Sequence, residues 1–141
     1  MSAHDAARIF QPVFALVALT FLVLLRIPYV RIRAALARRV VTDDFKLGES
    51  PRVPPDVALP NRNYMNLLEL PLLFYVLAIA LYVTGHVEPL QLTLAWCYVA
   101  LRFAHSLVHL TYNGVLHRLA CFALSNFVLS AMWLYFASTI L

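Results

Sequence analysis

The feature that most constrains this chain is a series of four apolar stretches, each about long enough to cross a membrane. A bilayer core of about 30 Å needs roughly 20 mostly apolar helical residues. The stretches of this length are residues 9–33, 61–84, 89–112 and 117–141. With 62% of 141 residues hydrophobic and 13% charged, the chain has more apolar surface than a soluble domain of this size can bury. The sequence therefore predicts an all-α fold, a transmembrane four-helix bundle that forms a single integral membrane domain over residues 1–141.

Residues 34–60 form the long polar connection, and their prolines and adjacent aspartates indicate a loop. The other two connections are short, so successive helices are expected to run antiparallel. The Lys and Arg residues on the side of the loop are Arg31, Arg33, Arg38, Arg39, Lys46, Arg52, Arg62 and Arg118, and Arg8 lies on the other side. Because positive residues favour the cytoplasmic side, we expect a cytoplasmic loop and both termini on the opposite side.

The basic net charge of +4 does not indicate nucleic-acid binding, because the arginines flank apolar stretches. Arginines after the first stretch form a stop-transfer pattern, so we expect this stretch to remain in the protein. Arg26 interrupts it, and a contact with a neighbouring subunit or with a lipid headgroup is left open. Cys97 and Cys121 lie in apolar stretches without disulfide or zinc spacing, so we interpret them as packing residues.

Polar residues occupy one face of the second stretch and one face of the third. The residues at helical spacing are Arg62, Asn66 and Glu69 on the second and Arg102, His105 and His109 on the third. Charges at the bilayer centre cost about 2.5–3.5 kcal/mol each on insertion scales, so both faces are expected to point away from lipid. At about 1.5 Å of rise per residue, Glu69 and His105 share a depth of about 10 Å, and Arg102 is expected to pair with Glu69. A third ligand beside His105 and His109 is not evident, so no metal site is expected.

Arginines near the loop side outnumber the single deep carboxylate. The four guanidinium groups in question belong to Arg31, Arg62, Arg102 and Arg118. Arginine forks suit carboxylates, so a peptide-like metabolite with two carboxylates and one ammonium group would fit, with Glu69 at the ammonium. A purely structural Glu69–Arg102 pair and ordinary positive flanking by the other arginines remain open as alternatives.

These residues resemble the signatures of the MAPEG family, the membrane-associated proteins in eicosanoid and glutathione metabolism. Residues 62–71, RNYMNLLELP, are similar to the second-helix motif of the family. Residues 102–105, RFAH, with His109 and Arg118 beyond them, are similar to its second signature, and residues 30–33 resemble the basic end of its first helix. The resemblance covers nearly the whole chain and is to a bacterial-type member, which implies a bacterial inner membrane.

The resemblance implies a left-handed bundle that assembles as a homotrimer, with glutathione as co-substrate between subunits near the cytoplasmic face. It implies that Arg118 is the catalytic residue and stabilises the glutathione thiolate, since a nearby cation lowers the pKa of a thiol. The candidate glutathione-binding residues are Arg31, Arg62, Asn66, Glu69, Arg102, His105 and His109, with Arg102 supporting Glu69. Membrane lipids and a lipophilic second substrate are the other expected partners.

The chain differs from the glutathione-using synthases of the family at four positions. Met65 stands where they have an arginine and His109 where they have a tyrosine, while Leu119 and Phe122 replace a serine and a tyrosine of some members. The leading prediction is a glutathione-dependent membrane transferase or peroxidase that acts on lipophilic electrophiles. The alternatives are a non-catalytic lipid-binding or scaffold protein of the same fold and an ion or proton pathway.

Overall fold

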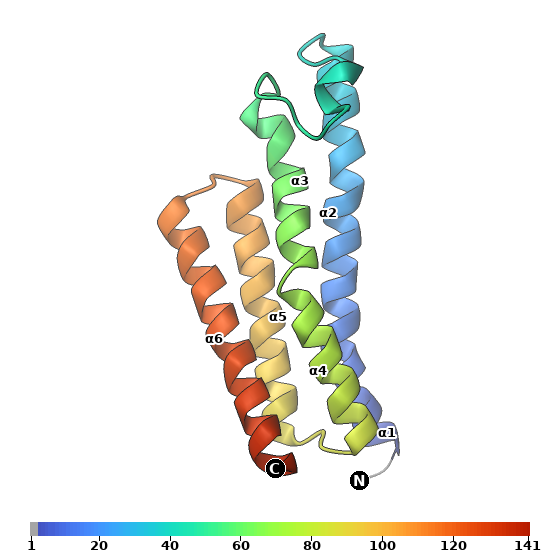
Figure 1. Ribbon diagram of the computed structural model, residues 1–141, viewed down its shortest axis with the longest axis vertical. Helices are drawn as coiled ribbons and strands as arrows, with labels where there is room; N and C mark the ends of the chain where they lie inside the picture. The colour runs from blue at the N-terminus through green and yellow to red at the C-terminus, as the bar shows by residue number, and fades with distance from the viewer. Residues whose placement is uncertain (1–2) are drawn as a thin grey trace.

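The computed structural model describes residues 3–141 and places long helices side by side in a narrow bundle (Figure 1). A short helix α1 (Ala3–Ala6) and a 3-10 turn η1 (Ala7–Ile9) lead into the helices of the bundle. These are α2 (Phe10–Leu36), α3 (Pro55–Leu68), α4 (Pro71–Thr84), α5 (Pro89–Leu110) and α6 (Val115–Ile140). No strand is assigned between residues 3 and 141, so the predicted all-α fold is confirmed.

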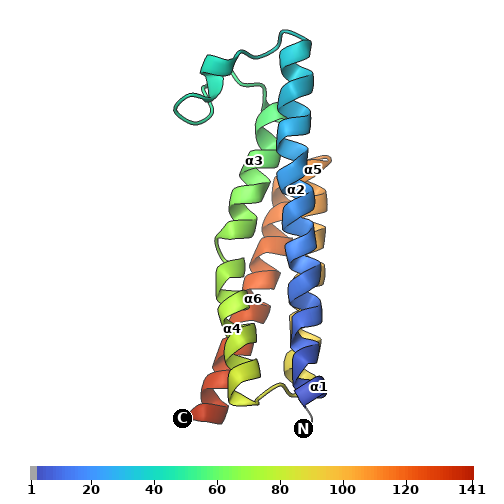
Figure 2. The same ribbon diagram turned by 90° about the vertical axis from the view of Figure 1, so that its right-hand side faces the viewer.

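The two ends of the bundle differ in shape. Both termini lie at one end, and the connection between α2 and α3 lies at the other (Figures 1 and 2). α2 and α3 extend past the α5–α6 turn, so this end projects from the bundle, and we call residues 27–60 the head (Figure 1). α2 continues to Leu36 and α3 begins at Pro55, so both helices include residues of the segment 34–60 that was expected to be a loop.

The second expected helix is broken at residues 69–70. Pro71 has no backbone N–H for the Leu67 carbonyl, and its ring clashes with the carbonyl four residues earlier in a continuous helix. α3 therefore ends at Leu68, Glu69 has a non-helical ψ of −95°, and α4 begins at Pro71. Residues after the break no longer follow the helical register of residues before it.

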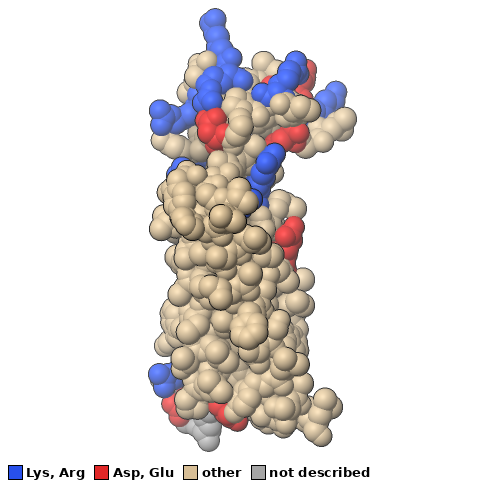
Figure 3. Space-filling view, turned by 90° about the vertical axis from the view of Figure 1, so that its left-hand side faces the viewer, with Lys and Arg blue, Asp and Glu red and all other residues tan. Residues whose placement is uncertain are grey.

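The core of the bundle is apolar and the outer surface is largely apolar as well. Leu16, Phe74, Leu77 and Met132 are fully buried between the helices, and large side chains such as Phe127 are exposed. Three helical segments are long and apolar enough to cross a membrane, namely Ala7–Leu36, Pro55–Thr84 and Val115–Ile140. Charged side chains gather toward the two ends, with mostly uncharged surface between them (Figure 3). This distribution suits a protein surrounded by lipid.

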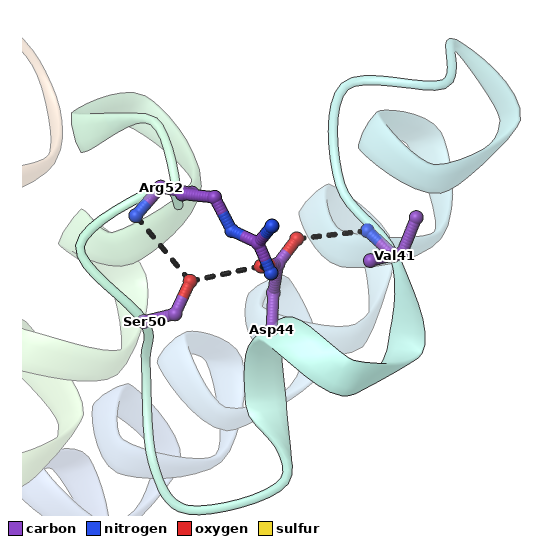
Figure 4. Close-up of polar contacts among 4 residues, drawn as sticks. All are labelled: Val41, Asp44, Ser50 and Arg52. Atoms are coloured by element: carbon purple, nitrogen blue, oxygen red, sulfur yellow. Dashed lines mark hydrogen bonds and ion pairs between the residues drawn. The ribbon is translucent and has the colours of Figure 1, made fainter.

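The connection between α2 and α3 is ordered by Asp44, which is 5% exposed (Figure 4). Its carboxylate accepts hydrogen bonds from the Val41 backbone N–H at 3.0 Å and the Ser50 hydroxyl at 2.9 Å, and pairs with Arg52 at 3.0 Å. The bond from Val41 contributes most to holding the pKa of Asp44 below its usual range. The head is therefore a folded element with its own polar contacts.

Candidate functional site

A cavity of about 520 Å³ lies between α3, α5 and α6, on the side of the bundle that faces the head. Its polar lining residues are Asn61, Arg62 and Asn66 from α3, His105 and His109 from α5, and Arg118 from α6. Its apolar lining residues are Met65, Val115, Leu119 and Phe122. Five of the residues expected at the site thus line one cavity, because each helix presents residues four apart on one face.

The two histidines form the α5 wall of this cavity. Both are buried, with their rings 5.7 Å apart. His105 Nδ1 lies 3.1 Å from the Arg118 carbonyl oxygen, which only accepts, so Nδ1 carries the proton and donates it. His105 Nε2 and His109 Nδ1 are buried without a hydrogen-bond partner among the described residues. Buried polar atoms are almost always paired in proteins, so these two nitrogens are candidates for contact with a bound molecule.

The α5–α6 turn positions Arg118 at the cavity. Asn113 has a positive φ of 48°, a conformation that asparagine adopts more readily than most residues, and this allows a short turn. Its side-chain oxygen accepts a hydrogen bond of 2.7 Å from Arg118 Nη1, and the Arg118 backbone N–H bonds the Gly114 carbonyl at 2.9 Å. The guanidinium of Arg118 is therefore fixed beside the histidines while part of it remains accessible.

Arg102 lies beneath the cavity and is fully buried. Its Nε donates to the Tyr98 hydroxyl at 3.1 Å and its Nη2 to the Asn126 side-chain oxygen at 3.1 Å. The guanidinium carbon also lies 5.4 Å from the ring centroid of Phe122, a residue that lines the cavity. Arg102 therefore ties α5 to α6 and supports the cavity floor rather than lining it.

The expected ion pair between Glu69 and Arg102 is wrong. Glu69 is exposed on the outer surface, and its carboxylate has no hydrogen bond or ion pair within the described chain. Glu69 keeps the helical register of α3, because its backbone N–H bonds the Met65 carbonyl at 3.2 Å. α3 instead packs on α5 through Asn63, which accepts a hydrogen bond from Ser106, so Glu69 turns outward. An ion pathway built on Glu69 and Arg102 loses its carboxylate for the same reason.

Arg31 also lies away from the cavity. It belongs to the head, where it pairs with Glu49 at 3.0 Å and lies 4.3 Å from the Phe45 ring centroid. Two polar residues at or beside the cavity, Asn61 and Asn126, were not predicted from the sequence. Asn61 precedes Arg62 and shares the cavity face, so helical spacing could have found it, whereas Asn126 becomes relevant only through packing of α6 on α5.

A comparison with protein-family models finds a match to the MAPEG family over residues 9–138. The chain belongs to the MAPEG family. The expected resemblance is thereby confirmed, together with an integral membrane protein of the helical-bundle fold, of a kind related to glutathione and eicosanoid metabolism. Neither the curated proteins nor the solved structures contain a match to this chain.

Within this MAPEG bundle, the cavity offers two guanidinium groups and two unpartnered imidazole nitrogens against a partly apolar wall. No acidic side chain lines it, so its electrostatics favour an anion. Its volume falls within the range of about 300–1,000 Å³ that is typical of small-molecule pockets. The described residues contain no group of three or more His, Cys, Asp or Glu side chains that could hold a metal ion.

Proposed function

We propose that the protein is a glutathione-dependent membrane transferase or peroxidase that acts on lipophilic electrophiles. The observation that carries this proposal is the cavity in which Arg62, Arg118 and two buried, unpartnered histidine nitrogens meet. Glutathione has two carboxylates, one ammonium group and a thiol, and arginine forks bind carboxylates with paired hydrogen bonds. Family membership supports the glutathione-related kind of protein, and the cavity supplies the chemistry for it.

The residues of the cavity divide between holding glutathione and activating it. Arg62 is exposed at the mouth and suits a carboxylate. Asn66 donates its side-chain N–H to the Arg62 carbonyl at 2.9 Å, which leaves its side-chain oxygen free to accept from an amide or ammonium group. His105 Nε2, unprotonated because Nδ1 carries the proton, accepts a further hydrogen bond. Arg118 stabilises the thiolate that remains when the glutathione thiol gives its proton to water. The sulfur then forms a bond to the electrophilic carbon of the second substrate, and the leaving group departs with the electron pair of the bond that breaks.

Glu69 supports the proposal of a homotrimer with glutathione between subunits. A charged carboxylate on an apolar, lipid-facing surface costs about 2.5–3.5 kcal/mol on insertion scales. A neighbouring subunit or a ligand ammonium group that covers Glu69 removes this cost. In such a trimer Glu69 and Arg31 would complete the site from another copy of the chain, near a cytoplasmic face set by the positive residues of the head.

A model electrophile tests the transferase directly. The full chain, solubilised in detergent, is expected to accelerate glutathione conjugation, and Arg118→Ala should lower turnover by at least tenfold. Arg33→Ala is the matched control, because it removes an exposed arginine of α2 whose one side-chain bond is to Tyr29. Turnover that persists in Arg118→Ala, or an unmodified protein without any turnover, would contradict the enzyme proposal.

A non-catalytic lipid-binding or scaffold role is the second candidate. Three apolar residues in the cavity wall favour it. Met65, Leu119 and Phe122 are apolar at the lining of the cavity, where the resemblance would have supplied hydrogen-bond donors. A scaffold of this kind is expected to melt at higher temperature with a fatty acid and to be unaffected by glutathione. The reverse pattern favours the transferase.

A further inference from the structure

Arg26 of α2 is exposed, and its side chain has no hydrogen bond or ion pair within the described residues. It lines two adjoining grooves that share Leu19, Arg26 and Leu110. One groove, of about 390 Å³, runs between α2 and α5 past Phe103 and Leu107. The other, of about 490 Å³, follows the outer face of α2 along Leu22, Val23, Leu25 and Tyr29. The two apolar grooves thus meet at the guanidinium of Arg26.

The depth of Arg26 differs from what its place in the first apolar stretch indicates. Leu110 is the last residue of α5, Thr111 follows it, and both line the first groove beside Arg26. α2 continues beyond this level into the head (Figure 1). Arg26 therefore lies where the bundle meets the head, at the boundary between apolar and polar surroundings, and not in the middle of the apolar body.

A second cation continues the same face of α2 toward the head. Arg26, Tyr29 and Arg33 are spaced i, i+3 and i+7, which places them on one side of the helix. Arg33 Nη1 donates to the Tyr29 hydroxyl at 3.1 Å. At about 1.5 Å of rise per residue, the two arginines are about 10 Å apart along the axis. No acidic side chain lines either groove, so Arg26 meets no carboxylate there.

We propose that this face of α2 binds a diacyl phospholipid with a net negative headgroup, its phosphate against Arg26 and its two acyl chains along the two grooves. Three observations support this proposal. Arg26 has no partner within the described residues, two apolar grooves meet at it, and it lies at the boundary between the apolar bundle and the head. A single-chain fatty acid would fill only one of the two grooves, and a soluble anion would make no apolar contact with either. The site is separate from the glutathione cavity, since the two share no lining residue.

The test compares lipid binding to the delipidated full chain in detergent, measured by native mass spectrometry with dioleoyl phosphatidylglycerol and dioleoyl phosphatidylcholine in competition. The unmodified chain is expected to prefer the anionic lipid, and Arg26→Gln to reduce that preference about fivefold, the effect of one arginine near an anionic membrane surface. Arg26→Lys should keep most of it. The control is Arg38→Gln, which removes an exposed head arginine that lines neither groove.

A second measurement needs no variant. A photoactivatable phosphatidylglycerol is expected to crosslink to peptides that contain residues 19–33 and 103–111. Equal binding of the two lipids, an unchanged preference in Arg26→Gln, or crosslinks confined to other helices would each overturn the proposal. Binding of oleate or inorganic phosphate that matches the anionic phospholipid would also overturn it. Because the sites are separate, Arg26→Gln is expected to leave any response to glutathione unchanged.

Discussion

The two sides of the cavity differ in how far a single chain completes them. On the α5–α6 side, Arg102, His105 and His109 are buried, and Arg102 is held by bonds within the chain. On the α3–α4 side, Arg62 and Glu69 are exposed, and the Glu69 carboxylate has no partner in the described chain. The first side is buried and partly tied together within the chain, whereas the second side presents its charges outward.

The face on which each helix packs explains this difference. α3 meets α5 through the buried residues Asn63 and Ser106, so Arg62 and Glu69 turn outward. α5 and α6 run without interruption through their polar residues, so every third or fourth residue stays on one face. The α3–α4 segment is broken at residues 69–70 by Pro71, and the polar face ends at the break. Charges that a folded chain leaves unpaired on an apolar surface are the ones most available to a ligand or a second subunit.

The largest effect on stability is expected from Arg102→Leu. This change removes the donors that reach the buried Tyr98 hydroxyl and the half-buried Asn126 side-chain oxygen, at a cost of about 2–4 kcal/mol. Glu69→Gln is the matched variant on the other side and should leave the stability of the isolated chain nearly unchanged. Thermal unfolding in detergent measures both. Equal losses in the two variants would remove the contrast between the sides.

A smaller loss of stability is expected from Ser106→Ala, which removes a hydrogen bond that joins the two sides. The Ser106 hydroxyl of α5 donates to the Asn63 side-chain oxygen of α3 at 3.2 Å, and both residues are buried. Ser106→Ala should cost about 1–2 kcal/mol, because Asn63 then lacks this donor. In a double-mutant cycle, Asn63→Leu combined with Ser106→Ala should cost less than the sum of the single changes. Strict additivity would mean that this bond does not couple α3 to α5.

The stability of the head should depend on pH through Asp44. The folded chain lowers the pKa of Asp44, so the stabilisation from its ionised form is complete above the ordinary value of about 4. It is lost as the pH falls through the lower folded pKa. Thermal unfolding of the wild type and Asp44→Asn between pH 2 and 7 is expected to show a difference that shrinks below pH 4. A difference that grows on acidification would contradict the contacts at Asp44.

The smallest effect is expected from Arg39→Gln. Arg39 and Asp56 form a pair of hydrogen bonds, at 2.8 and 3.0 Å, on the exposed surface of the head. Solvent screens such pairs, so the melting temperature should stay within error of the wild type. A marked loss would indicate that the head depends on this pair as much as on Asp44.

The sequence predicted the bundle and the α5–α6 side because both follow from helical periodicity. His105, His109 and Arg118 line one cavity, and uninterrupted helices need only their spacing to place them. The pairing of Glu69 with Arg102 was wrong because a shared depth does not determine which neighbour each helix face meets. Arg102 meets Tyr98 and Asn126 instead. The pairing of Arg31 with Glu49 depends on the path of an irregular loop, for which no periodic pattern exists.

The most direct test of the account is the effect of glutathione on the melting temperature of the detergent-solubilised full chain. Millimolar glutathione is expected to raise the melting temperature of the wild type and of Arg33→Ala, since a ligand stabilises the state that binds it. Arg118→Ala should show little or no rise. A wild type that melts at the same temperature with and without glutathione, or an equal rise in Arg118→Ala, would contradict the assignment of the cavity between α3, α5 and α6 as the glutathione site.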